Sequence, residues 1–258
     1  MKKLKYLAAI GLGLSMATSC SNSATEDFNE QHLDAAKKRL KNISANYSNN
    51  TSKKASTDFI YDSELKLEKV IAADGSRTSS LDYDNNGSLI NVKGNDVNEN
   101  LNLEELYQSP YKAFKEGTVL EYDTNKNPSK IIFHQKEYEY QNGTYIQVVK
   151  DYTAEVSYDN APNLFFYTLE AAGIIDVLDL VDLNIGVNMQ ATEIIKARAL
   201  FPMNNPSKII YKDDLGEIVE TINIAYTYDA SNYPTKAIIT SINKREVQKG
   251  EVSFSYYE

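Results

Sequence analysis

Three oxygen-bearing side chains, Asp82, Asp84 and Asn86, stand at alternate positions just before Gly87, a spacing that could bind calcium. Calcium takes about six to eight oxygen ligands, and an EF-hand loop supplies oxygens from positions one, three and five and a bidentate glutamate from position twelve. Position twelve is here Lys93, a cation where the ion needs a double acceptor. A tight turn explains the same residues, so calcium is the weaker of two interpretations.

Few other residues could perform catalysis or bind a metal. His32 and His134 are the only histidines, and no HExxH, zinc-type cysteine pattern, GxSxG elbow or phosphate-binding loop occurs. Asp176, Asp179 and Asp182 are three apart and could gather a cation on one helix face, but the polar side of an amphipathic helix explains them too. No pair of carboxylates stands out for glycoside hydrolysis among 36 acids. We therefore predict a protein that is not an enzyme and has no cofactor.

The single cysteine, Cys20, follows a basic start and the apolar run 6–17, and small residues precede it in Ala17-Thr-Ser-Cys20. This order is typical of a bacterial lipoprotein signal peptide, and twelve apolar residues are too few for the roughly 20 that span a bilayer as a helix. We predict that residues 1–19 are removed and that Cys20 is lipidated, which anchors the protein to the outer membrane on its periplasmic or outer side. The alternative is an ordinary signal peptide followed by a free thiol.

Charge and composition narrow the class of protein. Removing residues 1–19 takes away three lysines and no acid, which changes the net charge from −9 to −12. This acidic balance argues against nucleic-acid binding, which needs clustered Lys and Arg. The chain has 19 tyrosines and no tryptophan. Tyrosine favours strands and half-buried positions, where the ring packs and the hydroxyl reaches water.

The first part of the mature chain, residues 20–57, is predicted to be a tether, an amphipathic helix and a linker. The helix is predicted over 28–47, because apolar residues recur there three and four apart. Residues 48–57 are polar and predict the linker. The residues of the apolar stripe are Leu33, Ala36, Leu40, Ile43 and Tyr47.

From residue 58 to residue 258 the sequence predicts a β domain. Apolar and polar residues alternate strictly over 152–158, 221–228 and 252–256, which indicates a sheet with one buried face. About a dozen such runs, many joined by Asn, Asp, Gly and Pro turns, favour antiparallel pairing. Many runs are shorter than the roughly 9–11 residues of a tilted membrane strand, so we predict a water-soluble domain and not a pore.

The turns between these runs are self-similar. A Tyr-Asp pair is followed by a short polar stretch, and in several cases by a second strand. Tyrosine can end a strand with its ring on the core face, and aspartate can cap the turn by accepting backbone N–H groups two residues on. The predicted unit is a β-hairpin, and stacked hairpins bury a shared face. Exposed tyrosines that stack on sugars are the less favoured alternative. The pairs begin at Tyr61, Tyr83, Tyr122, Tyr158 and Tyr228.

These pairs resemble the tyrosine-aspartate repeat of large bacterial shell-forming proteins. The stretches Tyr158-Asp-Asn-Ala-Pro, Leu200-Phe-Pro-Met-Asn-Asn-Pro206 and Tyr226-Thr-Tyr-Asp-Ala-Ser-Asn-Tyr-Pro-Thr235 are more similar to Bacteroidetes-type lipoproteins of unknown function with a porin-like fold. The resemblance covers roughly residues 60–258. It implies a curved antiparallel sheet, open or nearly closed, and it transfers no catalytic residue.

An apolar insert at 160–201 interrupts the repeats, and we predict two or three short helices there, packed on the concave face. The fold class is therefore mainly β: a curved antiparallel sheet or partly closed barrel of hairpin repeats with a helical insert and an N-terminal amphipathic helix. The predicted function is a binding or scaffold module of the cell envelope. The first alternative is a carrier of a lipid or other apolar ligand, and the second is a carbohydrate-related surface protein or hydrolase. The carrier would use Phe165, Phe166, Ile174, Ile175 and Leu178.

Overall fold

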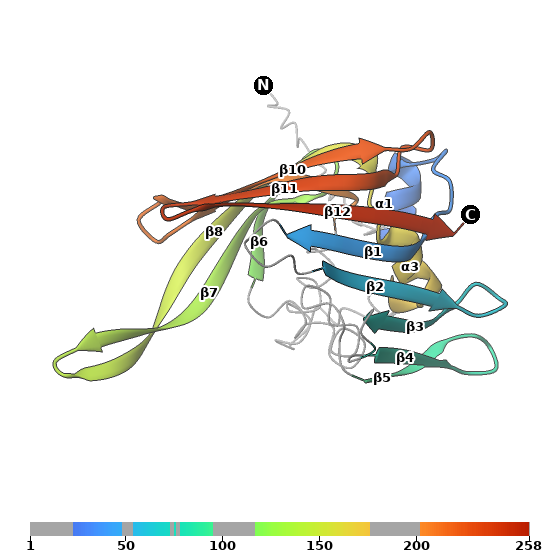
Figure 1. Ribbon diagram of the computed structural model, residues 1–258, viewed down its shortest axis with the longest axis horizontal. Coiled ribbons are helices and arrows are strands. Elements are labelled where there is room, and N and C mark those ends of the chain that lie inside the picture. Colours follow the sequence, from blue (N-terminus) through green and yellow to red (C-terminus); the bar gives the residue numbers. More distant parts are fainter. Residues whose placement is uncertain are drawn as a thin grey trace, which may run out of the picture.

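The computed structural model describes residues 23–47, 54–72, 75, 78–94, 117–175 and 202–257. Within these ranges, twelve strands form one antiparallel sheet, and two short helices lie on one of its faces (Figure 1). The sheet is strongly curved and does not close, because β5 and β6 are its two edges. The predicted fold class, a curved antiparallel sheet with a helical insert, is confirmed.

The elements follow one another in a simple order. The helices are α1 (Ala24–Gln31) and α3 (Phe166–Ala171). The strands are β1 (Arg39–Tyr47), β2 (Lys54–Tyr61), β3 (Leu67–Ala72), β4 (Thr78–Tyr83), β5 (Leu89–Gly94), β6 (Gly117–Tyr122), β7 (Pro128–Gln141), β8 (Thr144–Pro162), β9 (Asn204–Lys212), β10 (Ile218–Tyr228), β11 (Pro234–Asn243) and β12 (Val247–Tyr257).

The sheet is a meander whose first and last strands meet in its interior. The spatial order is β5-β4-β3-β2-β1-β12-β11-β10-β9-β8-β7-β6. Every neighbour in this order is also a neighbour in sequence, except that β1 pairs with β12, from Arg39 opposite Tyr257 to Tyr47 opposite Gly250. The two edge strands, β5 and β6, are therefore consecutive along the chain.

The two faces of the sheet differ in chemistry, as the alternating sequence predicts. On the concave face Ile43 lies opposite Phe254, and Val252 lies opposite Ala237. On the convex face charged side chains pair across strands, for example Lys236 with Glu251 at 2.7 Å. The convex face is thus suited to water, and apolar side chains gather on the concave face.

Helices α1 and α3 fill one end of the concave face. Phe28 is fully buried, and its ring stacks on Phe166 with 3.6 Å between centroids and meets the ring of Tyr167 edge-on. The backbone N–H of Leu40 donates to Thr168 Oγ1 at 2.9 Å, which ties α3 to β1. Large apolar burial of this kind is the main stabilising contribution to such a domain.

The predicted helix over residues 28–47 is wrong for most of its length. The helix is α1, which begins after the N-cap Ser23 and ends at Gln31, and the chain from Arg39 onward is strand β1. Leu33, which the helical stripe would bury, is 83% exposed. Residues 43, 45 and 47 also fit a period of two, and pairing with β12 and β2 selects the strand.

Two other boundaries also differ from the prediction. Strand β2 begins at Lys54, inside the predicted linker 48–57. In the apolar insert 160–201, the first residues belong to β8 and a helix follows at 166–171, as predicted for this part. Residues 176–201, which include Leu178, Asp176, Asp179 and Asp182, lie outside the described residues, as does Cys20. Among the described helices none has the length and apolar character needed to cross a bilayer.

Candidate functional site

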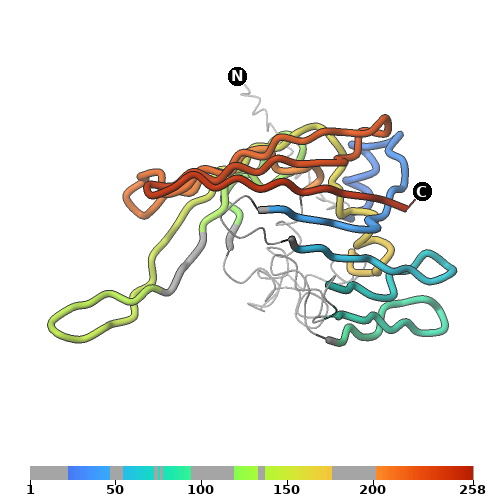
Figure 2. The backbone as a smooth tube through the Cα atoms, viewed as in Figure 1, coloured from blue at the N-terminus to red at the C-terminus, as the bar shows by residue number. Residues whose placement is uncertain are grey.

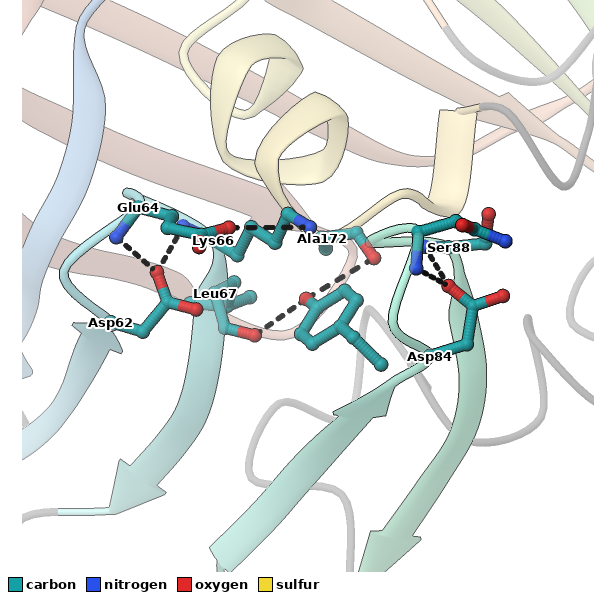
Figure 3. Close-up of polar contacts among 9 residues, drawn as sticks. Asp62, Glu64, Lys66, Leu67, Asp84, Ser88 and Ala172 are labelled. Carbon is teal, nitrogen blue, oxygen red and sulfur yellow. Dashed lines mark hydrogen bonds and ion pairs between the residues drawn. The ribbon is translucent and has the colours of Figure 1, made fainter.

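Five turns at the rim of the sheet share one geometry. In the turn after β4, Asp84 Oδ1 accepts the backbone N–H of Ser88 at 2.8 Å (Figure 3). It also accepts the N–H of Asn86 at 2.9 Å, and Gly87 adopts a left-handed φ of 81°. The expectation that aspartate caps the turn is confirmed after Tyr61, Tyr83, Tyr122 and Tyr228, whereas Asp159, after Tyr158, accepts from Ala161 and Asn205 and closes no such turn. The same two bonds are made by Asp62, Asp123, Asp213 and Asp229.

The turn also accounts for the calcium-like spacing. Asp82 lies in β4, where its carboxylate accepts Lys93 Nζ at 2.6 Å and Asn91 Nδ2 at 3.2 Å. The hydrogen bond from Lys93 lowers the pKa of Asp82. Asp84 Oδ1 is already bonded to two backbone N–H groups of the turn. In the described part of the chain, no group of three or more His, Cys, Asp or Glu side chains is arranged to hold a metal.

Each of five strands, β2, β4, β8, β10 and β12, has a tyrosine near its end whose hydroxyl donates a hydrogen bond to a carbonyl near the start of the preceding strand. Tyr226 in β10 donates its hydroxyl to the carbonyl of Pro206 in β9 at 3.1 Å, and Tyr256 in β12 donates to Pro234 in β11 at 2.6 Å. We name these five tyrosines the tyrosine latch. Burial raises the pKa of every latch hydroxyl. The other three bonds join Tyr61 to Leu40, Tyr83 to Leu67 and Tyr158 to Pro128.

A buried asparagine network supports the end of the sheet next to α1. Asn127 is fully buried: its Oδ1 accepts the backbone N–H of Met203 at 2.7 Å and of Asn204 at 3.0 Å, and its Nδ2 donates to Asp123 and Asn204. The neighbouring Asp159 accepts the backbone N–H of Asn205 at 3.1 Å instead of closing a hairpin. These bonds join the β6–β7 turn to the start of β9. No pattern in the sequence predicted this network.

His32 lies at the border of the asparagine network. Its Nε2 is 3.3 Å from the carbonyl oxygen of Met203 and 3.4 Å from Asn204 Nδ2, and its ring packs on Phe28. Burial lowers the pKa of His32. The imidazole contacts backbone, amide and apolar groups, which suits a structural role. The other histidine, His134, lies in β7, where its backbone is opposite Asp151.

The most distinctive element is a two-stranded ribbon that projects from the sheet (Figures 1 and 2). Strand β6 pairs with β7 as far as Phe133, and β9 pairs with β8 from Thr153 onward. Between these points, residues 134–151 pair only with one another, from His134 opposite Asp151 to Gln141 opposite Thr144. We name residues 134–151 the arm. At about 3.4 Å per residue it extends roughly 25 Å.

One face of the arm is aromatic and carries no charge in its outer part. Tyr140 lies opposite Tyr145, with ring centroids 5.0 Å apart, and Tyr138 lies opposite Gln147. Tyr138, Tyr140 and Tyr145 are 71%, 66% and 70% exposed, and Val149 on the same face is 62% exposed. These tyrosines are not core residues, contrary to the general expectation from alternation. We name this surface, residues 138, 140, 145, 147 and 149, the tyrosine face.

The opposite face of the arm is charged and internally paired. Lys150 Nζ lies 2.8 Å from Glu139 and 3.3 Å from Glu137. Hydrogen bonds lower the pKa of both acids, with Tyr152 the largest cause at Glu137 and Lys150 the largest at Glu139. The acids of the charged face are therefore paired with Lys150 and with the neighbouring Tyr152, whereas the tyrosine face presents large apolar rings to solvent.

A second apolar surface lies on the concave face beyond the helices. Ile222 lies opposite Ile209, and Ile224 lies opposite Ile239, so the four side chains share one face across β9, β10 and β11. All four are only half-buried. Their face continues that of Phe254, which packs on the core. Aliphatic side chains in a concave setting could contact an apolar ligand.

Comparisons with known proteins give architectural neighbours only. No family model matches the chain, and no curated protein matches it. Among solved structures, a porin-like protein from Bacteroides uniformis is 13% identical, with a TM-score of 0.34, over 84% of this chain and 96% of that chain. A porin-like protein from Bacteroides vulgatus is 10% identical, with a TM-score of 0.40, over 85% and 99%. A putative outer membrane lipoprotein-sorting protein domain from Vibrio parahaemolyticus is 13% identical, with a TM-score of 0.31, over 89% of both chains.

The solved neighbours thus include porin-like proteins from Bacteroides. With TM-scores and identities in this range, a functional proposal has to rest on the residues of this chain.

Proposed function

We propose that this protein is a non-enzymatic binding module of the cell envelope, anchored through a lipid on Cys20, and that the arm contacts its partner. The observation that carries the proposal is the tyrosine face, where Tyr138, Tyr140 and Tyr145 are each about two-thirds exposed. Tyrosine is enriched at the energetic centres of protein interfaces, because its rigid ring buries a large area at small entropic cost. Scattered apolar residues are normal on a surface, but such residues gathered on a projecting element indicate contact.

The position of the arm supports the same function. Helix α1, which begins only a few residues after Cys20, and the arm lie at opposite ends of the longest axis in Figure 1. Ser23 follows Cys20 by three positions, so the chain between them can span at most about 10 Å. A lipid on Cys20 would therefore hold the α1 end near the membrane and leave the arm free to reach another envelope component.

Photo-crosslinking in the native cells tests this proposal. A photoreactive phenylalanine at Tyr140 is expected to give discrete adducts with a partner. The matched control is Asn223, an exposed position on the convex face of β10. The proposal predicts adducts from position 140 that are missing from position 223. Equal labelling from both positions, or none from position 140, would show that the arm is not the contact element.

A carrier of an apolar ligand is the second candidate, and the half-buried patch of Ile209, Ile222, Ile224 and Ile239 favours it. Mass spectrometry of the protein extracted from its own membrane tests the carrier and the anchor together. An acyl mass on the peptide that begins at Cys20 is expected. A carrier also retains a non-covalent lipid, which Ile224→Gln should release without unfolding the sheet. If the protein retains no non-covalent lipid under native conditions, the carrier function is excluded, and the proposal of a binding module is unaffected.

A further inference from the structure

The two long edges of the arm are protected very differently. In the arm, β7 carries Glu137 and Glu139, and charges of this kind keep exposed edge strands from pairing with other chains. Strand β8 has no charged residue from Thr144 to Val149, where the sequence is Thr-Tyr-Ile-Gln-Val-Val. This segment is rich in β-branched and aromatic residues, without Pro or Gly, and such residues favour strand pairing. The β8 edge of the arm is therefore open to pairing.

The backbone of this edge has hydrogen-bonding groups directed outward. Asn142 and Gly143 have φ values of 50° and 84°, as in a two-residue hairpin turn closed by Gln141 and Thr144. The closing pair exchanges its hydrogen bonds across the ribbon, so the N–H and C=O groups of the next residue point away from β7. By alternation the same holds for Tyr145, Gln147 and Val149. In the described part of the chain, no strand pairs with this edge.

We propose that the β8 edge of the arm binds the same edge of a second copy of this chain, in antiparallel pairing centred on Gln147. About this centre Tyr145 of one copy lies opposite Val149 of the other, and Ile146 lies opposite Val148. Gln147 meets its own counterpart, and amide side chains can hydrogen-bond to each other. Lys150 lies opposite Thr144, so no like charges meet. A two-fold axis makes the contact self-complementary and closed.

The charges of the other edge argue against the corresponding β7 pairing. Centred on Tyr138, that arrangement places Glu137 of one copy opposite Glu139 of the other, and like charges directly opposite are destabilising. An isolated two-stranded ribbon is also only marginally stable in water. Pairing through β8 converts two such ribbons into one four-stranded sheet whose two tyrosine faces lie on the same side. This inference does not depend on the identity of any partner of the tyrosine face.

Disulfide trapping in the mature chain, residues 20–258, tests the register. Cys20→Ser removes the only native thiol, and Gln147→Cys then places one cysteine at the two-fold centre. Hydrogen-bonded antiparallel pairs have Cα atoms about 5.5 Å apart, which is within the range of a disulfide. The matched control is Tyr138→Cys, on the same face and directly opposite Gln147, but on β7. Mild oxidation is expected to give a covalent dimer at position 147 and none at position 138.

Sedimentation velocity provides an independent readout. The Cys20→Ser chain is expected to sediment as a dimer, and Gln147→Lys, which places two cations at the centre, is expected to sediment as a monomer with unchanged circular dichroism. Tyr138→Lys adds the same charge on β7 and should leave the dimer intact. A monomeric parent chain at every concentration would overturn the proposal. Equal yields of the disulfide-linked dimer from cysteines at positions 138 and 147 would overturn it too. So would a dimer that dissociates with Tyr138→Lys but persists with Gln147→Lys.

Discussion

Raising the pH above about 10 is expected to destabilise this protein steeply through the tyrosine latch. Unfolded tyrosine ionises near pH 10, whereas burial raises the pKa of all five latch hydroxyls in the folded chain. The folded state then keeps protons that the unfolded state releases. The latch contribution is therefore complete below pH 10 and is lost as the pH rises toward the folded pKa values. Each hydroxyl can remove up to about 1.4 kcal/mol per pH unit, against a total stability of about 5–15 kcal/mol.

Circular dichroism and tyrosinate absorbance, followed together against pH, measure this effect. We expect loss of the sheet and ionisation of the latch in a single step. Tyr226→Phe should cost about 1 kcal/mol at neutral pH, because the carbonyl of Pro206 loses its donor, but it should make the alkaline dependence shallower. Tyr140→Phe, on the arm, should change neither quantity. Ionisation of the buried tyrosines with the sheet intact would contradict the latch.

Replacing Asn127 with alanine is expected to lower the free energy of unfolding by about 3–6 kcal/mol. The change leaves the backbone N–H groups of Met203 and Asn204 buried without an acceptor, and each unsatisfied buried donor costs about 1–3 kcal/mol. It also removes the side-chain bonds from Asn127 to Asp123 and Asn204. Denaturant unfolding measures the loss as a lower midpoint.

The control for this change is Asn223→Ala, at an exposed position of β10, which should stay within about 0.5 kcal/mol of the parent. Asn127→Asp separates hydrogen bonding from size. It keeps the two acceptor bonds but brings a second carboxylate to Asp123, so it should also destabilise, and less so at acidic pH. A loss below about 1 kcal/mol for Asn127→Ala would show that the network is not a structural support.

The strands and their turns were predictable from sequence because each has a local cause. Alternation marks the buried face, and an aspartate followed by a left-handed residue marks the turn, as with Asp84 and Gly87. The helix predicted over 28–47 failed because its spacing fits both periods in part. Only the pairing of Ile43 with Phe254, more than 200 residues away, decides between them.

The candidate site was harder to predict because it depends on what surrounds each residue. Tyr140 and Tyr226 occupy similar alternating sequences, yet one is exposed on the arm and the other donates to Pro206. The difference arises because neighbouring strands end at Phe133 and Thr153, which no local pattern reveals. Asparagine is a common turn residue, and nothing local indicates that Asn127 and Asn204 form a hydrogen bond that joins segments 77 residues apart. The Asn-Gly pair at 142–143 is typical of a two-residue hairpin turn and was a signal that the sequence predictions did not use.

The pairing of β1 with β12 has a consequence for how the molecule is made. Strand β1 has β2 on one side, and its other neighbour, β12, is synthesised only after the other described strands of the sheet, so the middle of the sheet forms late. Such distant pairing gives a high contact order and slow maturation. Until β12 is available, the unpaired edge of β1 can pair with other chains, and binding by a chaperone would prevent such pairing.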